Sequence, residues 1–239
     1  MPRAVVVIPA RFDSTRFPGK PLAVLKGRPL IQRVYKQVSL ASRIDGIFVA
    51  TDDQRIFDAV TEFGGKAIMT SSAHASGTDR IAEAARNMDC DIVINVQADE
   101  PFIRPEMVDD VVELLADDQR ASISTLARRT TSVKEILSPN VVKVVMDNEG
   151  YAMYFSRSPI PYYRDEWKGL DSIKIPTSRV SVFKHVGIYG FRKDSLMVFS
   201  KTEQGKAEKI EKLEQLRALA CGMKIKVKET VYDTIGIDT

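Results

Sequence analysis

Three cations lie close together in the loop that follows the first apolar segment of the chain. Arg11, Arg16 and Lys20 fall within ten residues, together with two hydroxyl side chains and a Pro-Gly pair. A guanidinium group can donate two hydrogen bonds to phosphate oxygens, and a lysine adds a compact positive charge. This set favours a polyanion such as a triphosphate, although a solvated basic loop would have the same composition. The spacing matches neither G-x-x-x-x-G-K-[ST] nor G-x-G-x-x-G, which disfavours a P-loop or a dinucleotide site.

A second polar group occupies Asn95-Val96-Gln97-Ala98-Asp99-Glu100-Pro101, directly after an apolar run. Adjacent carboxylates are costly to bury unless they face a metal ion or another cation. Oxygen ligands without nearby His or Cys suit Mg²⁺. We predict Asp99 as the ligand, because Glu100 precedes a proline and only one of two successive side chains can point into a cleft. The alternative is that these acids cap the next helix or pair with the basic loop.

The two groups together indicate nucleotidyl or phosphoryl transfer, because such reactions combine a polyphosphate site with a magnesium carboxylate. The segments around them must bring them to one place. We expect strands at residues 4–9, 47–50, 66–69 and 91–96, and helices at about 28–41, 53–63, 78–88 and 105–115. This alternation predicts an α/β fold with a mostly parallel sheet covered on both faces. Such sheets bind ligands beyond the carboxyl ends of their strands, where both polar groups fall.

The pattern changes after about residue 120. We expect further strands at residues 122–127, 141–146, 151–155, 186–191 and 225–229, and one continuous helix at 206–220. Residues 156–184, here called the arm, interrupt the pattern with three prolines and with Tyr162, Tyr163 and Trp167. The sequence contains no internal repeat and no low-complexity linker. The simplest interpretation is a single domain, residues 1–239, with an inserted arm.

The composition excludes several classes of protein. The chain has 239 residues, of which 44% are hydrophobic and 28% charged, which is close to the globular average. The net charge of +3 is too small to indicate binding of nucleic acid. No apolar stretch approaches the roughly 18–20 residues of a membrane span. Two cysteines, Cys90 and Cys221, cannot form a disulfide framework, and we expect a reduced, cytoplasmic protein. We expect His74 to be a loop residue.

Several longer motifs are similar to those of the sugar-nucleotide cytidylyltransferases. They are Val7-Ile8-Pro9-Ala10-Arg11, Phe17-Pro18-Gly19-Lys20-Pro21-Leu22, Ser76-Gly77-Thr78-Asp79-Arg80, Asn95 to Pro101, Tyr154-Phe155-Ser156-Arg157, His185-Val186-Gly187-Ile188-Tyr189, Glu211-Lys212-Leu213-Glu214-Gln215-Leu216-Arg217 and Gly236-Ile237-Asp238-Thr239. In this order, over essentially the whole chain, they resemble the 3-deoxy-manno-octulosonate (Kdo) cytidylyltransferases, or CMP-Kdo synthetases. The resemblance implies a nucleotide-diphospho-sugar-transferase-like (Rossmann-like) fold and Mg²⁺-dependent transfer of CMP from CTP to Kdo. It also implies a cytoplasmic homodimer, formed largely through the arm, whose product serves lipopolysaccharide assembly.

The resemblance also implies roles for individual residues. Those expected at the CTP phosphates are Arg11, Arg16 and Lys20, and those expected at the cytidine are Ser76, Gly77, Thr78 and Arg80. Those expected near Kdo are Gln97, Arg157, His185, Tyr189, Glu214 and Gln215. Asp99 and Asp238 are expected to hold Mg²⁺, with no protein general base required. Several assignments have a structural alternative: residues 76–79 as a helix cap, which is compatible with the cytidine contact, His185 and Tyr189 as core residues, and Glu214 as a surface charge.

Two features depart from the family pattern. Ala98 stands where the family usually has glycine, which matters if the backbone needs a positive φ there. The family usually continues beyond the Asp-Thr pair that ends this sequence, and we expect Asp238 to become ordered only when ligands bind.

Three other activities stay open: a cytidylyltransferase for 8-amino-Kdo, one for another sugar acid such as sialic acid, and a non-catalytic CTP-binding protein.

Overall fold

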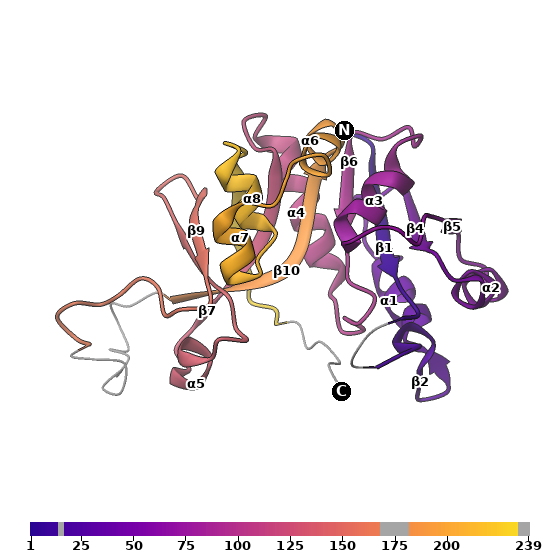
Figure 1. Cartoon of the computed structure of the whole chain (residues 1–239), viewed down its shortest axis with the longest axis horizontal. Coiled ribbons are helices and arrows are strands. Elements are labelled where there is room, and N and C mark those ends of the chain that lie inside the picture. The colour runs from indigo at the N-terminus through magenta and orange to yellow at the C-terminus, as the bar shows by residue number, and fades with distance from the viewer. Residues whose placement is uncertain (14–16, 168–181, 234–239) are drawn as a thin grey trace.

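The computed structural model describes residues 1–13, 17–167 and 182–233 of the chain. Its centre is a mixed nine-stranded sheet with the order β11-β7-β10-β6-β1-β4-β5, to which β8 and β9 are added through β10 (Figure 1). The strands are β1 (Ala4–Ala10), β4 (Gly46–Thr51), β5 (Ala67–Met69), β6 (Ile92–Asn95), β7 (Ile123–Thr130), β8 (Lys143–Met146), β9 (Ala152–Ser156), β10 (Val182–Arg192) and β11 (Ile225–Glu229). Two short strands, β2 (Val24–Leu25) and β3 (Arg28–Pro29), form a separate hairpin.

The central part of the sheet, from β11 to β5, is mostly parallel, as predicted, while β8 and β9 are added in antiparallel pairs. Strand β1 pairs in parallel with β4 and β6, β4 with β5, and β7 with β11. Strand β10 runs antiparallel to both β6 and β7 and joins the two parallel parts. The carboxyl ends of β1 and β4 point to the same side of the molecule, the lower side in Figure 1.

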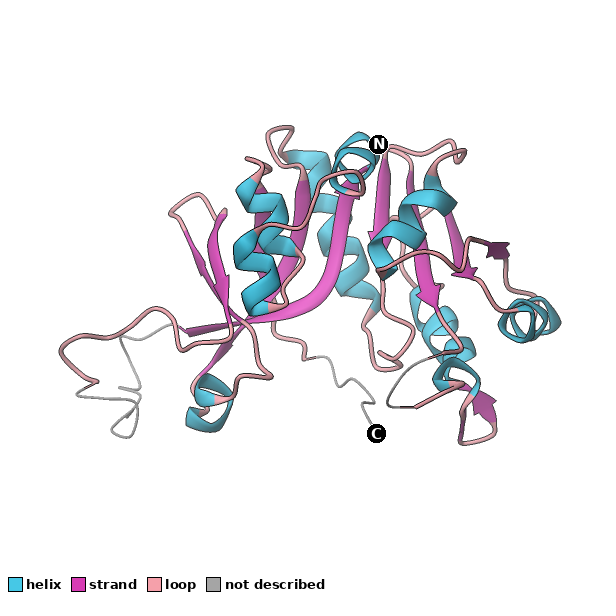
Figure 2. Ribbon diagram, in the orientation of Figure 1, coloured by secondary structure: helices cyan, strands magenta, loops and turns pink. Residues whose placement is uncertain are grey.

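Helices cover both faces of the sheet (Figure 2). Their bounds are α1 (Leu30–Val38), α2 (Gln54–Glu62), α3 (Gly77–Ala85), α4 (Pro105–Asp117), α5 (Val133–Leu137), α6 (Lys193–Phe199), α7 (Lys206–Glu211) and α8 (Gln215–Ala220), with a 3-10 turn at Lys20–Leu22. Side chains of β1 alternate between two cores: Val6 and Ile8 pack in the core that contains α1 and α4, and Val5 and Val7 in the core that contains α3 and α6. This alternation is what makes β1 read as an uninterrupted apolar run. None of the helices in the described ranges is long and apolar enough to cross a membrane.

Local capping explains where several predicted helices begin. The Asp53 side chain accepts a hydrogen bond from the Arg55 amide (2.9 Å) at the start of α2, as expected. Pro105 occupies the first turn of α4, where its missing amide proton costs nothing. Helices α5 and α6 were not predicted, because five and seven residues give too little of the amphipathic period to recognise.

The continuous helix predicted at residues 206–220 is wrong. It is two helices, α7 and α8, separated at Lys212, whose backbone has a left-handed conformation (φ 55°). The apolar side chains on both sides keep nearly helical spacing, so the pattern does not reveal the break. The break turns the chain so that residues 212–215 face a cavity.

The described part of the arm also corrects an expectation. Trp167 is only 1% exposed and packs against Ile136, Val182 and Tyr163 of its own chain. Tyr162, by contrast, is 53% exposed, and its hydroxyl donates a hydrogen bond to the Trp167 carbonyl (2.7 Å). A dimer that buries the arm was expected to cover all three aromatic side chains, but Trp167 is already covered within its own chain. Residues 168–181 of the arm lie outside the described residues.

Candidate active site

The basic loop leaves the carboxyl end of β1 and returns through a tight turn. Gly19 has a positive φ (73°), and its amide donates a hydrogen bond to the Phe12 carbonyl (2.7 Å). A Cβ at this position would lie 3.1 Å from the Phe12 ring, so both conformation and space favour glycine. The turn places Lys20 at the start of the 3-10 turn, facing the end of β6. Arg16 lies outside the described residues.

A first cavity, here called the phosphate cavity, joins the ends of β1 and β6. Its walls are formed by Pro9, Arg11, Lys20, Pro21, Ala75, Gly77, Gln97, Ala98 and Asp99. Lys20 Nζ lies 2.6 Å from Asp99 Oδ2, with 15% and 35% of the two side chains exposed. The alternative that the acidic group pairs with the basic loop is therefore realised in this structure. Arg11 donates a hydrogen bond from Nη2 to the His74 carbonyl (2.6 Å) and also lines the cavity.

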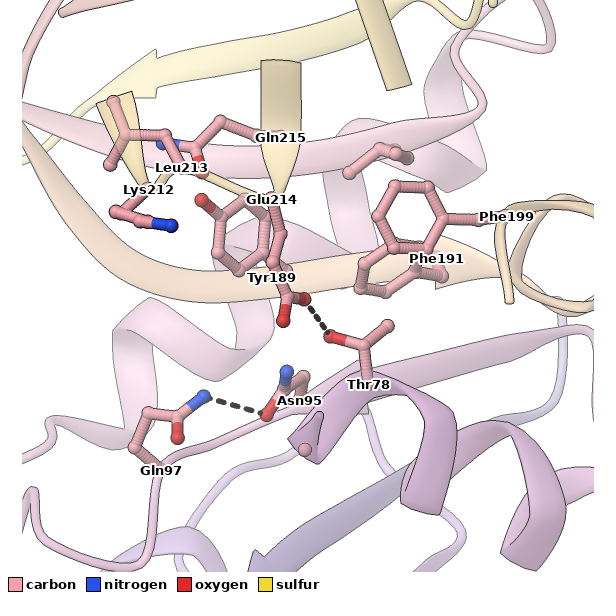
Figure 3. A pocket seen from close by; sticks show the side chains of 12 residues that line it. Thr78, Asn95, Gln97, Tyr189, Phe191, Phe199, Lys212, Leu213, Glu214 and Gln215 are labelled. Carbon is pink, nitrogen blue, oxygen red and sulfur yellow. Dashed lines mark hydrogen bonds between the residues drawn. The ribbon is translucent and has the colours of Figure 1, made fainter. Parts of the chain in front are cut away.

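A second cavity, here called the sugar cavity, adjoins the first, because Gly77 and Gln97 line both. Its walls are formed by Gly77, Thr78, Asn95, Gln97, Ile123, Tyr189, Phe191, Phe199, Lys212, Leu213, Glu214 and Gln215 (Figure 3). Glu214 Oε2 accepts a hydrogen bond from the Thr78 hydroxyl (2.7 Å), across the cavity from one element to the other. Gln97 donates a hydrogen bond to Asn95 Oδ1 (3.1 Å) in another part of the wall. A small molecule rich in hydroxyl groups would find donors and acceptors on several walls.

Two titratable groups beside the sugar cavity are held in their neutral forms. Burial raises the pKa of the Tyr189 hydroxyl, and the nearby Glu214 carboxylate raises it further. Burial lowers the pKa of His185 to about 3. The His185 ring contacts those of Tyr189 and Phe155, with centroids 5.2 Å away in each case. His185 lies behind Tyr189 and does not line either cavity.

The proton on the neutral His185 ring is placed by its neighbour. The Thr125 hydroxyl lies 2.7 Å from the Ile188 carbonyl and 2.9 Å from His185 Nε2. The Thr125 hydroxyl has a single proton, and the Ile188 carbonyl can only accept a hydrogen bond. The hydroxyl therefore donates its proton to the carbonyl and can only accept from His185. His185 therefore donates from Nε2 to Thr125 Oγ1, and Tyr189 has a fixed neutral ring behind it.

Three predicted substrate contacts have other roles in this structure. Ser76 caps α3: its hydroxyl accepts from the Asp79 amide (3.1 Å), while the Asp79 side chain accepts from the Ser76 amide. Arg80 is fully buried and donates to Thr70 Oγ1 (2.5 Å) and Asp52 Oδ2 (2.7 Å). It lines neither cavity, because it is directed from α3 toward the loops after β4 and β5.

Arg157 is the third such residue. Its guanidinium donates to the carbonyl oxygens of Glu211 (2.6 Å) and Pro139 (2.8 Å) and does not line either cavity. The Glu211 carboxylate in turn accepts a hydrogen bond from the Arg157 amide (2.9 Å). In this state Arg157 fastens the start of the arm to the break between α7 and α8, next to the cavity wall. The contact of Arg157 with substrate stays a prediction.

The structure also adds cavity residues to which the sequence analysis gave no site role. Asn95, Lys212, Leu213, Phe191 and Phe199 line the sugar cavity, and Ala75 lines the phosphate cavity. Asn95 is the last residue of β6 and is 3% exposed, a polar residue at the end of an apolar run. A polar residue at the carboxyl end of a buried strand indicates a site residue, so Asn95 could have been predicted from the sequence. Lys212 and Leu213 belong to the motif at residues 211–217, but the predicted continuous helix would have turned one of them away from the cavity.

The departure at Ala98 is accommodated. Lys26 and Lys212 are the non-glycine residues with positive φ in the described ranges, and Ala98 is not among them. Its methyl group lines the phosphate cavity and packs against the core beneath. The replacement of glycine therefore costs no backbone strain at this site.

The donor set at the end of β6 fits a hard cation in part. Asp99 contributes a partly exposed carboxylate, and Gln97 an amide oxygen near it in the same cavity wall. Oxygen donors of this kind suit Mg²⁺. No cluster of three metal-ligating side chains exists among the residues that the structure describes. Asp238, the second predicted ligand, lies outside them.

Comparison with known proteins decides the family. The sequence profile of the cytidylyltransferases matches residues 5–225. The 3-deoxy-manno-octulosonate cytidylyltransferase of Trichlorobacter lovleyi is 49% identical over 235 residues, which are 98% of this chain and 93% of the relative. The enzyme of the same name from Thermodesulfovibrio yellowstonii is 51% identical over 243 residues, with the same coverage of both chains. The chain belongs to the 3-deoxy-manno-octulosonate cytidylyltransferase family.

Solved structures agree with this family assignment. A CMP:2-keto-3-deoxy-manno-octonic acid synthetase complexed with CTP has a TM-score of 0.90 and 43% identity, over 99% of this chain and 93% of that one. The 4-diphosphocytidyl-2C-methyl-D-erythritol synthase of Anaerococcus prevotii shares only the fold, with a TM-score of 0.61 and 14% identity over 100% of this chain and 91% of that one. The predicted fold class is confirmed, and the chain is a nucleotidyltransferase of the cytidylyltransferase family.

Proposed function

We propose that this protein transfers CMP from CTP to the C2 hydroxyl of Kdo and releases pyrophosphate. The observation that carries the proposal is the pair of adjoining cavities. One presents two cations and a carboxylate, and the other presents hydrogen-bonding side chains, with Gly77 and Gln97 between them. A nucleoside triphosphate and a polyhydroxylated acid can then meet at the shared wall. The names and the CTP complex of the relatives support these two substrates.

The cations act on the leaving group. The reaction breaks the bond between the α-phosphorus and the oxygen that bridges it to the β-phosphorus. Negative charge grows on that oxygen and on the departing pyrophosphate. Arg11 and Lys20 are held at the phosphate cavity by the fold before substrate arrives. Donors fixed in advance need little reorganisation in the transition state, which makes this kind of stabilisation large. We expect Arg16 to contribute to the same set.

The side chains of the sugar cavity orient the acceptor. Tyr189 keeps its proton and can donate a hydrogen bond, while Glu214 and Gln215 can accept from sugar hydroxyl groups. Neither Tyr189 nor His185 suits a general base, because Tyr189 is hard to deprotonate and His185 is hard to protonate. We propose that the chain positions the hydroxyl and leaves its activation to a bound cation.

That cation is Mg²⁺ in this proposal, held by Asp99 and Asp238. When bound, it would lower the pKa of the sugar hydroxyl and neutralise charge on the α-phosphate. In this structure Asp99 forms an ion pair with Lys20. To hold the metal, Asp99 would have to give up Lys20 as its partner.

The assay of this proposal is pyrophosphate release from CTP and Mg²⁺ with a panel of sugar acids: Kdo, 8-amino-Kdo and sialic acid. We expect Kdo to give the highest kcat/KM. A clear preference for 8-amino-Kdo or sialic acid would reassign the acceptor and keep the reaction. Binding of CTP without release of pyrophosphate with any acid would favour the non-catalytic alternative.

We further propose a cytoplasmic homodimer whose product supplies lipopolysaccharide assembly. Free thiols suit a reducing compartment, and both Cys90 and Cys221 are unpaired. For the dimer, the support is exposed apolar surface on and beside the arm. Tyr162 of the arm and Met153 and Tyr154 of β9 are 53%, 64% and 41% exposed.

A further inference from the structure

One chain of contacts leads from the last turn of α3 to Arg11 at the phosphate cavity, and its first two residues, Glu83 and His74, have no part in the function described above. Glu83, on α3, contacts the loop between β5 and α3 at two points. Its Oε2 accepts a hydrogen bond from the Ser71 amide (2.9 Å) and contacts His74 Nε2. The His74 carbonyl then accepts the hydrogen bond from Arg11 Nη2 (2.6 Å). These residues are brought together by the fold, since Arg11 and His74 are 63 positions apart.

We propose that Glu83 and His74 form a latch that positions Arg11 for the phosphates of CTP. The inference rests on the proposed function, in which Arg11 binds phosphate. Glu83 and His74 are positioning residues, because neither lines the phosphate cavity, while Arg11 does.

Geometry explains why Arg11 needs such support. The Nη2 nitrogen is committed to the His74 carbonyl, and Nε and Nη1 have no partner among the described residues. Because Nη2 is fixed, the plane of the guanidinium is oriented, and with it the directions of Nε and Nη1. An arginine held in this way loses less rotamer entropy on binding phosphate than a free side chain would.

The loop itself would be loose without Glu83. Residues 71–73 are exposed, and their hydrogen bond out of the loop, within the described ranges, is the one from the Ser71 amide to Glu83. At one end the loop is fixed by the Ser76–Asp79 capping box, and Glu83 fixes the middle. The His74 and Ser71 contacts lower the pKa of Glu83, so the carboxylate is charged at neutral pH. A charged acceptor makes both hydrogen bonds stronger than a neutral one would.

The test compares the affinities for CTP and for cytidine. We expect Glu83→Ala to raise the Kd of CTP about tenfold, the change that a coupling of about 1.4 kcal/mol produces. The Kd of cytidine, which has no phosphate, should stay within about twofold. Glu83→Gln keeps an acceptor for the Ser71 amide and should recover part of the loss.

Two controls accompany these variants. Alanine favours helix, so α3 should persist in Glu83→Ala, and thermal unfolding checks this. Glu62→Ala, at the exposed end of α2, is the matched control.

A double-mutant cycle separates a latch from a general structural effect. In an Arg11→Ala background, adding Glu83→Ala should change the Kd of CTP by less than about twofold. An equal loss of cytidine and CTP affinity, or a full further loss in the Arg11→Ala background, would overturn the latch alone. Unchanged CTP affinity in Arg11→Ala would instead overturn the phosphate role of Arg11 in the proposed function, and the latch with it.

Discussion

Lys20 and Asp99 form an ion pair (Nζ to Oδ2, 2.6 Å) that joins the loop after β1 to the loop after β6. The two residues were predicted to bind different groups, the phosphates of CTP and Mg²⁺. Their contact means that each shields the other before substrates arrive, which reduces the cost of holding both charges in one cavity. Substrate binding must exchange this pair for a phosphate contact and a metal contact.

Replacement of Asp99 separates these two roles. We expect Asp99→Asn to reduce turnover to below about a tenth of wild type, a loss of more than about 1.4 kcal/mol of barrier stabilisation. CTP binding should be retained or become tighter, because Lys20 loses a competing anion. Steady-state kinetics and calorimetric titration with CTP measure the two effects. Asp117→Asn, at the exposed end of α4 and outside both cavities, is the control. Turnover above a tenth of wild type would remove Asp99 from the metal site.

Lys212 should tolerate glycine better than valine. A left-handed backbone costs a non-glycine residue about 1–2 kcal/mol, and a β-branched side chain more. We expect Lys212→Gly to unfold in urea at the same midpoint as the parent or slightly higher, and Lys212→Val to lose about 1–2 kcal/mol. Equal stability of Lys212→Val and the parent would show that the break between α7 and α8 is not constrained at this residue.

His185 should make the fold sensitive to acid. Its pKa is about 3 in the folded chain, and an unfolded histidine has a pKa near 6.5. Below about pH 6.5 the unfolded state therefore binds a proton that the folded state does not bind. The free energy of unfolding falls as the pH falls. The linkage amounts to about 2 kcal/mol between about pH 7 and about pH 5.

The measurement is urea unfolding of wild type and His185→Gln across that range. The wild type should lose about 2 kcal/mol more than the variant on acidification. Glutamine can still donate to Thr125 but does not titrate. Parallel pH profiles of the two proteins would mean that His185 has the same pKa in the folded chain as in the unfolded chain.

The proposed homodimer predicts a mass near twice 26.7 kDa in light scattering. Tyr162→Glu places a charge on the exposed aromatic surface of the arm and should shift the population toward monomer at micromolar concentration. A wild-type mass of 26.7 kDa at that concentration would contradict the dimer.

Sequence patterns predicted the parallel part of the fold well, and for physical reasons. Strands β1 and β6 are buried on both faces, so they appear as apolar runs, and loops at their ends carry the polar residues that meet in the phosphate cavity. The break at Lys212 could not be predicted, because one residue in a left-handed conformation leaves the apolar spacing almost intact.

Side-chain direction was the other limit. Arg80 follows the motif that lines the cavities, but it turns under α3 to Asp52, a residue that only the fold brings near. Arg157 similarly finds carbonyl groups at the break between α7 and α8, which the predicted continuous helix would not have offered. The sequence predicts His74 only as a loop residue, because its contact with Glu83 depends on the path of the loop over α3.

The proposed transfer of CMP is tested most directly by following the phosphorus atoms of CTP. The enzyme is incubated with Kdo, Mg²⁺ and CTP that carries a radioactive label either at the α or at the γ position. Transfer of CMP predicts that the α label appears in the sugar nucleotide and the γ label in pyrophosphate, and that neither product forms without Kdo. Transfer of the γ label to the sugar, or release of either label as free phosphate with no sugar nucleotide formed, would contradict the proposed reaction.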